Sequence, residues 1–240
     1  MNEFEPNRRS LMKNASLTAA TIGVAVLGGA IGTARAQTAA PKAMTYAVKP
    51  IPFDPQKIKG MSEKILVSHY QNNYTGAVKR LNSITDQLAS LDYDKAPVFL
   101  INGLKREELV ATNSMILHEI YFAGLGEPNN PGQTLAEAIA RDFGSMDRWR
   151  TEFVAMGKAQ GGGSGWVLLT YSPRDKRLMN AWAADHTMTL AGGHPILALD
   201  MYEHAYHMDF GAKAADYVMA TMGAINWTNA DREYTRYSRD

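Results

Sequence analysis

The chain has 240 residues, of which 45% are hydrophobic, 20% charged and 9% aromatic, a composition that supports one or two packed domains and excludes a wholly disordered chain. It carries 25 Lys and Arg against 24 Asp and Glu, a balance that provides no basic surface for nucleic acid. It contains no cysteine, which excludes disulfides, thiolate metal sites, iron–sulfur clusters and cysteine nucleophiles. Any chemistry must therefore use oxygen and nitrogen groups.

Residues 1–36 have the pattern of an export signal and are set apart from the fold. Arg8-Arg9 opens a twin-arginine pattern, a weakly apolar stretch runs from Ala15 to Gly32, and Ala34-Arg35-Ala36 matches a signal-peptidase site. We expect twin-arginine export to the periplasm, cleavage after Ala36, and no stable membrane anchor once the signal is removed. Because this route carries folded proteins, it favours a protein that loads a cofactor before export.

The first half of the remaining chain predicts an arm followed by a helical hairpin. Residues 37–60 are rich in proline and are expected to be extended. Apolar residues at three- and four-residue steps predict one long helix over residues 62–90 and a second over residues 105–123. Two such helices pack as an antiparallel pair, so residues 61–125 are predicted to form a helical hairpin domain.

The second half predicts an α+β domain over residues 130–228, beyond a break rich in proline and glycine. Helices are expected over 133–143 and 146–159, strands of a small three-stranded antiparallel sheet over 166–171, 178–183 and 195–200, and helical structure again over 203–224. The glycine run 161–165 leads into a strand and lacks a Gly-Lys-Ser/Thr ending, so it is interpreted as a turn and not as a phosphate loop. Residues 229–240 are expected to be a C-terminal tail. The predicted fold class is therefore α+β.

The residues best suited to chemistry are the six histidines. A single histidine on a helix, such as His69 or His118, is more often structural than functional. The run from Asp200 to His204 differs, because it places a carboxylate at the end of an apolar strand and an imidazole four residues later. An unpaired buried aspartate is energetically costly, so metal coordination or an ion pair is expected there.

The segment Asp200-x-x-Glu203-His204-Ala205-Tyr206, followed by Asn226-Trp227, resembles the metal-binding signature of iron/manganese superoxide dismutases. Ser68-His69-Tyr70, His118-x-x-Tyr121-Phe122 and Gly163-Ser164-Gly165-Trp166 resemble other segments of that family, in the same order. The resemblance implies that His69, His118, Asp200 and His204 bind one iron or manganese ion per chain. It also implies superoxide as the substrate, conversion of superoxide to dioxygen and hydrogen peroxide, and a homodimer.

The same resemblance assigns residues around the metal. Trp166, Tyr202 and Phe122 would surround the ligands, and Glu203 would bridge the two subunits of the dimer. His186 falls near the position of an outer group that hydrogen-bonds metal-bound solvent, and we interpret it as catalytic. His207 could replace absent gateway groups or could lie on a helix surface, and the sequence leaves both interpretations open.

Several positions depart from the family pattern, and two of them bear directly on activity. Ala77 stands where the family has a gateway tyrosine, and Asn73 stands where it usually has a histidine. The first alternative is therefore a catalytically impaired or repurposed periplasmic metal-binding protein of the same fold. A weaker alternative is a related redox enzyme acting on peroxide or another substrate. The sequence does not distinguish iron from manganese.

Overall fold

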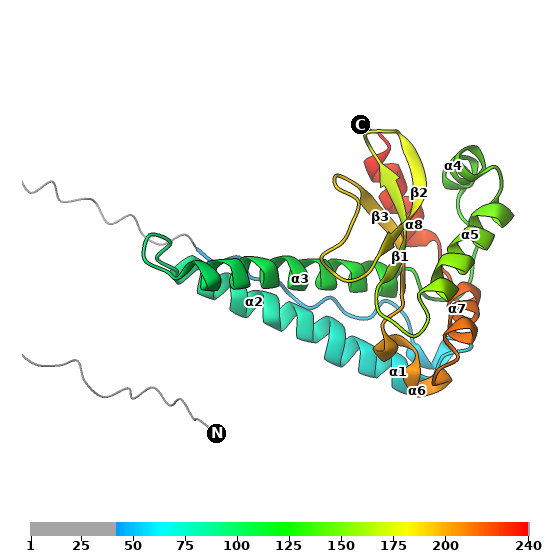
Figure 1. The fold of residues 1–240 in the computed structure, drawn as a ribbon. Coiled ribbons are helices and arrows are strands. Elements are labelled where there is room, and N and C mark those ends of the chain that lie inside the picture. The colour runs from blue at the N-terminus through cyan, green and yellow to red at the C-terminus, as the bar shows by residue number, and fades with distance from the viewer. Residues whose placement is uncertain (1–41, 240) are drawn as a thin grey trace, which may run out of the picture. The chain divides into compact units, whose positions relative to one another are not determined.

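Two long antiparallel helices and a three-stranded sheet form the framework of the protein, as seen in a computed structural model that describes residues 42–239 (Figure 1). The predicted fold class, α+β with a helical hairpin before a small antiparallel sheet, is confirmed. The export signal expected over residues 1–36 lies outside the described residues. Within residues 42–239, no helix is long and apolar enough to cross a bilayer.

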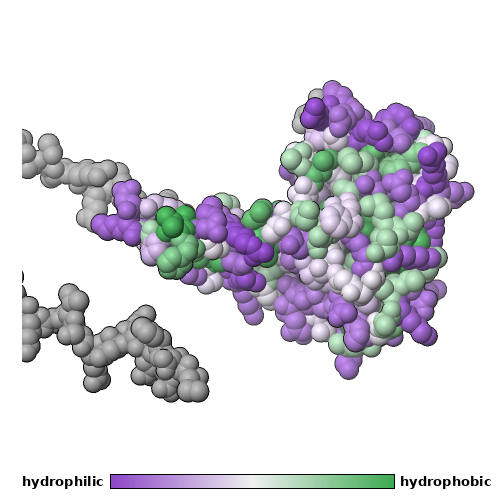
Figure 2. Space-filling model, in the orientation of Figure 1, coloured by the Kyte–Doolittle hydropathy of each residue, from purple (hydrophilic) through white to green (hydrophobic). Residues whose placement is uncertain are grey.

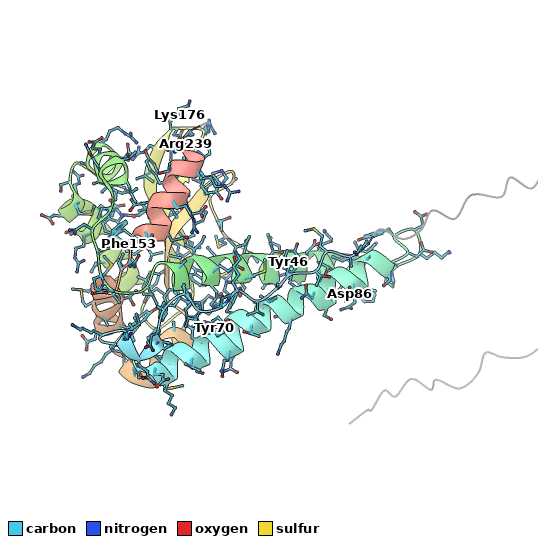
Figure 3. All side chains as sticks on the ribbon, turned by 180° about the vertical axis from the view of Figure 1, so that it is seen from behind. Tyr46, Tyr70, Asp86, Phe153, Lys176 and Arg239 are labelled. Carbon is cyan, nitrogen blue, oxygen red and sulfur yellow. The ribbon has the colours of Figure 1, made fainter. Side chains whose placement is uncertain are left out.

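The expected arm is extended from residue 42 up to a short 3₁₀ turn, η1 (Pro55–Lys57). Hydrogen bonds with side chains of the hairpin hold it in place. The backbone N–H of Tyr46 donates to Oδ1 of Asn82 at 2.8 Å, and Nδ2 of Asn82 donates to the carbonyl of Tyr46 at 2.9 Å. Figure 3 shows Tyr46 and Tyr70 along the same hairpin, with Tyr46 farther from the sheet. The arm therefore lies against the hairpin as an extra layer.

The first predicted helix is continuous, but its winding changes from α-helical to π-helical at His69. Ser62 caps α1 (Glu63–Ser68) by accepting a hydrogen bond from the backbone N–H of Ile65. A π-helical turn, η2 (His69–Tyr74), follows and leads into α2 (Thr75–Ser90). The buried residues of η2, His69 and Tyr74, are five positions apart, in agreement with the wider π turn. The turn thus points both side chains inward.

The second helix of the hairpin, α3 (Val98–Ala123), begins earlier than the predicted residue 105. The side chains of Val98 and Phe99 are 82% and 77% exposed, so the first turn of α3 has no buried apolar face. The sequence pattern could not reveal this turn, because amphipathic periodicity reports only residues that face a core.

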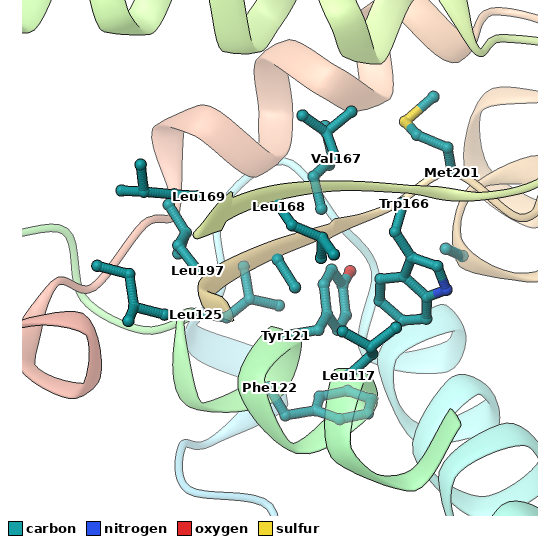
Figure 4. Packing of buried hydrophobic residues seen from close by; sticks show 14 of the residues in the cluster. Leu117, Tyr121, Phe122, Leu125, Trp166, Val167, Leu168, Leu169, Leu197 and Met201 are labelled. Atoms are coloured by element: carbon teal, nitrogen blue, oxygen red, sulfur yellow. The ribbon is translucent and has the colours of Figure 1, made fainter. Parts of the chain in front are cut away.

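The predicted sheet and the helices before it are confirmed. Helices α4 (Gln133–Phe143) and α5 (Met146–Ala159) precede strands β1 (Trp166–Ser172), β2 (Arg177–Ala183) and β3 (His194–Asp200). The strand order is β2-β1-β3, both pairs are antiparallel, and every residue of the central strand β1 is buried. In this register Trp166 lies opposite Asp200. Figure 4 shows Leu117 and Tyr121 of α3 packed against the strands.

The C-terminal part corrects two expectations. The helical segment predicted over residues 203–224 is broken into η3 (Glu203–Ala205), α6 (His207–Phe210) and α7 (Ala214–Gly223), and α6 ends at Gly211, whose φ is +55°. Residues 229–240, expected to be a tail, form helix α8 (Thr228–Tyr237) over most of their length. Its buried hydrophobic residues Ala230 and Tyr234 are four positions apart and dock the helix, although the rest of it is polar. Because the segment is mostly polar, the sequence pattern did not predict this helix.

Candidate metal centre

His69 reaches the interior because it lies on the buried side of the first helix. The two preceding core residues, Ile65 and Leu66, are each 1% exposed, and the side chain of His69 is buried to the same degree. Its Nε2 atom lies 3.1 Å from Oδ2 of Asp200. The helical hairpin and the end of the sheet therefore meet at this pair.

His118 comes from the second helix of the hairpin and is held in one tautomer. Its Nδ1 atom lies 2.6 Å from the carbonyl oxygen of Ser114, one helical turn earlier. A carbonyl oxygen can only accept a hydrogen bond, so Nδ1 carries the hydrogen and Nε2 of the neutral ring presents a lone pair. Among the described residues this buried Nε2 has no hydrogen-bond partner. An unsatisfied buried acceptor of this kind fits a metal ligand.

Asp200 ends strand β3 and is fully buried. Its Oδ1 atom accepts a hydrogen bond from the backbone N–H of Tyr202 at 2.8 Å, which fixes the carboxylate. Its Oδ2 atom lies 3.2 Å from Nε2 of His204 and 3.5 Å from Nε2 of His118. One carboxylate oxygen therefore faces three imidazoles.

The four predicted ligands converge on one point. One donor atom from each of His69, His118, Asp200 and His204 can be chosen so that all lie within 4.8 Å of one another. Three of these side chains are almost inaccessible, whereas that of His204 is 27% exposed. The centre is therefore open to solvent on its His204 side.

The electrostatics of the pocket hold these groups in the states that bind metals. Burial acts to raise the pKa of Asp200, but hydrogen bonds from His204 and His69 outweigh it and hold that pKa well below its usual range. Burial lowers the pKa of His69, despite the opposing effect of Asp200. Burial, together with repulsion from His69, lowers the pKa of His118 to about 3. At neutral pH the carboxylate is ionised and both imidazoles are neutral, as metal coordination requires.

The donor set fits the metal that the sequence implied. Imidazole nitrogens suit iron and carboxylate oxygens suit manganese, so a set of three imidazoles and one carboxylate can hold either ion. The Nε2 atom of His118, which has no partner within residues 42–239, supports the same assignment, because a metal ion would satisfy it. The residues present therefore fit one iron or manganese ion.

His186, predicted to act in catalysis, lies beside this cluster. The indole Nε1–H of Trp166 donates to Nδ1 of His186 at 3.0 Å, and the His186 ring stacks on Tyr202 with a centroid distance of 4.8 Å. The centroids of His186 and His118 are 6.0 Å apart. Burial lowers the pKa of His186, so its ring is neutral. Since Nδ1 accepts a hydrogen bond, the hydrogen of that neutral ring is on Nε2.

Three further residues were predicted to surround the ligands: Trp166, Phe122 and Tyr202. Trp166 and Phe122 are buried and contact the ligands: the centroid of Trp166 is 5.2 Å from His118, and that of Phe122 is 5.1 Å from His69. Tyr202 stacks on His204 at 5.3 Å, and burial raises its pKa to about 12. These three side chains therefore line the site.

His207 and Glu203 lie outside the cluster. His207 begins α6 with an exposed side chain, and within the described part of the chain no side-chain hydrogen bond or ring contact joins it to the four ligands. The buried side chain at this point is that of Tyr206, so its neighbour faces outward. The structure thus does not bring His207 to the site. Glu203 is exposed on η3, next to His204.

The positions that depart from the family pattern have specific surroundings. Ala77 is buried, and Asn73 is partly buried on η2. Two tyrosines of η2 bind the arm. The hydroxyl of Tyr70 donates to the carbonyl of Lys49 at 2.6 Å, and the hydroxyl of Tyr74 accepts from the backbone N–H of Lys49 at 2.8 Å. The hydroxyl of Tyr74 also donates to Glu119, the neighbour of His118, at 3.1 Å.

Sequence reasoning missed the residues that orient the site. Ser114 lies four positions before His118, so helical spacing could have identified it. Asn113 donates from Nδ2 to the carbonyl of His186 at 2.6 Å across 73 positions of sequence, and no local pattern reveals such a contact. Tyr121, which the sequence motif contained without a role, has its ring centroid 5.0 Å from that of His69.

Comparisons with known proteins agree with this geometry. A sequence profile described as "Iron/manganese superoxide dismutases, C-terminal domain" matches residues 131–233. A protein of Cupriavidus metallidurans named superoxide dismutase (Fe) is 64% identical over 197 residues, which cover 82% of this chain and 100% of that protein. The chain belongs to the iron/manganese superoxide dismutase family.

More distant members of the family are also similar. The protein of Haloferax volcanii named superoxide dismutase (Mn) 2 is 31% identical over 195 residues, covering 80% of this chain and 96% of the relative. That of Haloarcula marismortui named superoxide dismutase (Mn) is 32% identical over 198 residues, covering 78% and 92%. The enzyme is thus a superoxide dismutase that uses iron or manganese.

Proposed function

We propose that His69, His118, Asp200 and His204 are the ligands of the single iron or manganese ion with which the enzyme dismutates superoxide. The convergence of their donor atoms within 4.8 Å carries this assignment, and Nε2 of His118, which lacks a partner in the part of the chain that the structure describes, supports it. An ion held by these four residues would supply one-electron chemistry, by which one superoxide is oxidised and a second is reduced. Two superoxide ions and two protons thereby become one dioxygen and one hydrogen peroxide.

The protein determines where superoxide can approach. His69, His118 and Asp200 are enclosed, whereas the side chain of His204 is 27% exposed. We therefore assign the His204 side as the entrance for superoxide. Trp166 and Phe122 are buried against His118 and His69 and keep bulk water away from these ligands.

We assign His186 the task of directing a proton into the site. Trp166 occupies its Nδ1 atom, so the Nε2–H of the neutral ring is the group left to donate a hydrogen bond. The stacking of His186 on Tyr202 and the hydrogen bond from Asn113 to its carbonyl hold the ring in place. A proton donor fixed in this way shortens the path from solvent to the reacting oxygen.

The ligand assignment is tested by metal analysis of purified protein. We expect about one iron or manganese per chain in the wild type and less than about a tenth of that in Asp200→Asn, which keeps the shape of the side chain but lacks its charge. Equal metal content in both proteins would reject Asp200 as a ligand.

We further propose that the enzyme is a homodimer in which Glu203 contacts the partner near the site entrance. Its support is the exposed position of Glu203 beside the partly exposed His204. We expect Glu203→Ala to raise the dissociation constant of the dimer in sedimentation equilibrium. Glu137→Ala, which removes an exposed carboxylate on α4, should not. A monomeric wild type would reject the proposal.

We also propose that the enzyme is exported by the twin-arginine route to the periplasm. Arg8-Arg9, the apolar stretch after them and the Ala34-Arg35-Ala36 site support this localisation. Replacing Arg8 and Arg9 by lysine should retain the enzyme in the cytoplasm, whereas Arg35→Lys should leave export unchanged. Cytoplasmic wild-type enzyme in cell fractions would contradict the proposal.

A further inference from the structure

The carboxylate of Asp209 makes a two-point contact with Ser62, which lies 147 positions earlier in the sequence. Its Oδ2 atom accepts a hydrogen bond from the backbone N–H of Ser62 at 2.6 Å, and its Oδ1 atom accepts from the hydroxyl of Ser62 at 2.7 Å. Hydrogen bonds of this length to a carboxylate are charge-assisted and stronger than neutral ones. Asp209 belongs to α6, and Ser62 caps α1. The contact therefore joins the segment that follows His204 to the start of the helix that leads to His69.

On one side, the contact is connected to His69 through the first turns of the helix. The Oγ atom of Ser62 accepts from the backbone N–H of Ile65 at 3.1 Å while its hydrogen is donated to Asp209. A negative charge at this point is favourable, because the free N–H groups of a first helical turn carry partial positive charge. The N–H of Leu66 donates to the carbonyl of Ser62 at 3.2 Å, and the N–H of His69 donates to the carbonyl of Leu66. Continuous backbone hydrogen bonds thus lead from the contact to the ligand.

On the other side, short turns connect Asp209 to His204. The backbone N–H of Tyr206 donates to the carbonyl of Glu203 at 3.1 Å. The N–H groups of Asp209 and Phe210 donate to the carbonyl of Tyr206 at 3.1 and 2.9 Å. Tyr206 is 1% exposed, so its side chain holds these turns against the core. Since His204 lies inside this hydrogen-bonded segment, a displacement of Asp209 would also displace His204.

The rings of His69 and His204 depend on the backbone segments that carry them. Among residues 42–239, Oδ2 of Asp200 is the one hydrogen-bond partner of each ring, at 3.1 Å from Nε2 of His69 and 3.2 Å from Nε2 of His204. The two ring centroids are 4.8 Å apart. Because no second hydrogen bond fixes either ring there, their spacing follows that of the two segments, which the contact between Asp209 and Ser62 joins.

We propose that Asp209 is a positioning residue that holds His69 and His204 at the spacing needed to bind the metal. It acts through Ser62 and touches neither the ligands nor the substrate. The inference rests on the proposed ligand set and adds to it a residue outside the site. Its physical basis is preorganisation: a metal binds more tightly to ligands that are already held in the right place, and groups that orient ligands commonly change metal affinity by about 10-fold to 100-fold.

The contact can be removed without disturbing the core. Ser62 and Asp209 are both exposed. Figure 2 shows hydrophilic residues interspersed with apolar ones over the end of the molecule where Figure 1 places α1 and α6. The start of α1 also remains docked through Met61 and Ile65, which are 6% and 1% exposed. We therefore expect Asp209→Ala to fold and to keep the four ligands.

A matched contact lies away from the metal. Both carboxylate oxygens of Asp231, on α8, accept from the backbone N–H of Gly132 at 2.9 Å, 99 positions earlier. Gly132 is the capping residue of α4. Like Asp209, Asp231 thus caps a helix that is distant in sequence, but neither α4 nor α8 carries one of the four ligands. Asp231→Ala therefore removes a contact of the same kind without acting on the metal centre.

The test is a titration of the metal-free full chain with manganese(II), and with iron(II) in the absence of oxygen, in competition with a chelator. We expect Asp209→Ala to raise the dissociation constant of the metal about tenfold. Asp231→Ala should change it by less than about twofold, because its contact is independent of the site. Asp209→Glu keeps both acceptor oxygens and should recover most of the lost affinity. In thermal unfolding of the metal-free proteins, both alanine variants should lose a similar amount of stability, about 2–4 °C in Tm.

The outcomes separate this inference from the ligand assignment. A wild type that binds one metal per chain, with an equal dissociation constant in Asp209→Ala, would overturn the role of Asp209 and leave the ligand set standing. Equal weakening in Asp231→Ala would also overturn it, since a general loss of stability would then explain the effect. So would a failure of Asp209→Glu to recover any affinity, because the carboxylate would then not be the group that acts. A wild type that binds neither metal would reject the ligand set and this inference together.

Discussion

The Nε2 atom of His118 lies 3.5 Å from Oδ2 of Asp200, is buried, and makes no hydrogen bond within the described part of the chain. The carbonyl of Ser114 holds the opposite side of the ring, so the lone pair of Nε2 cannot turn toward another donor. An unsatisfied buried acceptor destabilises the metal-free protein by about 1–3 kcal/mol. Metal binding relieves this cost, and His118 is therefore a sensitive position at which to test the centre.

Replacing His118 by glutamine should remove the metal. The substitution deletes an aligned imidazole nitrogen from a four-residue donor set, and we expect metal content and dismutation rate to fall at least tenfold. Elemental analysis and a superoxide assay measure both. His194→Gln is the control, because His194 stacks on Tyr237 and is not among the four converging residues. Full metal content in His118→Gln would show that His118 is not a ligand.

Replacing Trp166 by phenylalanine should slow the reaction without emptying the site. It removes the Nε1–H that holds Nδ1 of His186, while keeping an aromatic side chain in the core. We expect the rate per bound metal to fall by about 10-fold to 100-fold.

Trp149→Phe is the matched control for Trp166→Phe. It removes a similar indole hydrogen bond, to Oδ1 of Asn180, from a residue that is also 1% exposed or less. It should leave the rate per bound metal unchanged. Equal rates in both variants would show that the Trp166–His186 hydrogen bond does not contribute to turnover.

The metal-free protein should lose stability as the pH falls from about 6.5 to 4. Burial lowers the pKa of His69 and lowers that of His118 to about 3, so between these pH values the unfolded chain binds protons that the folded protein does not. Each such histidine lowers the free energy of unfolding by up to about 1.4 kcal/mol per pH unit. The depressed pKa of Asp200 acts in the same direction, but only near and below its ordinary value of 3.8.

Urea unfolding of the metal-free protein at several pH values measures this dependence. The His118→Gln variant should show a slope shallower by about 1.4 kcal/mol per pH unit, since one of the two buried imidazoles is gone. A wild type whose free energy of unfolding is constant over this range would contradict the proposed neutral state of these histidines.

Gly165 should not tolerate a side chain. Its φ is +131°, and a Cβ atom would lie 2.2 Å from the carbonyl oxygen of Ala183. Its own carbonyl accepts from the backbone N–H of Met201 at 2.9 Å, just after Asp200, so displacement here would also disturb the site. We expect Gly165→Ala to lower the free energy of unfolding by about 3 kcal/mol.

The control for Gly165→Ala is Gly163→Ala in the same glycine run. There the nearest atom to an added Cβ is the carbonyl oxygen of Gln160 at 3.5 Å, an ordinary contact. Thermal or urea unfolding should show a change of less than about 0.5 kcal/mol. A similar loss in both variants would show that the run is uniformly intolerant and that Gly165 has no special position.

The convergence of the four predicted ligands could be anticipated because each ligand lies in a short segment whose sequence pattern is recognisable. Asp200 and His204 lie four positions apart at the end of an apolar strand, and the buried residues around His69 and His118 recur at three- and four-residue steps along their helices. The amphipathic pattern and the turn residues therefore placed the hairpin and the sheet. The family resemblance then connected segments that periodicity alone cannot bring together.

The remaining features depend on contacts that sequence patterns do not contain. Helix α8 is held by two buried hydrophobic residues, Ala230 and Tyr234, in a polar segment, and the first turn of α3 faces solvent, so neither shows the expected periodicity. The π turn at His69 and the outward position of His207 follow from packing around them. Such features require three-dimensional contacts, because tertiary packing overrides local preference.

The most direct test of the metal centre is a titration of metal-free protein with iron(II) or manganese(II) while the dismutation rate is followed. The four-residue site predicts that the rate rises linearly and stops rising at one equivalent of metal per chain, and that Asp200→Asn shows no such rise. A wild-type rate that never exceeds that of the free metal ion, or a rise in Asp200→Asn equal to that of the wild type, would contradict the assignment of His69, His118, Asp200 and His204 as the catalytic centre.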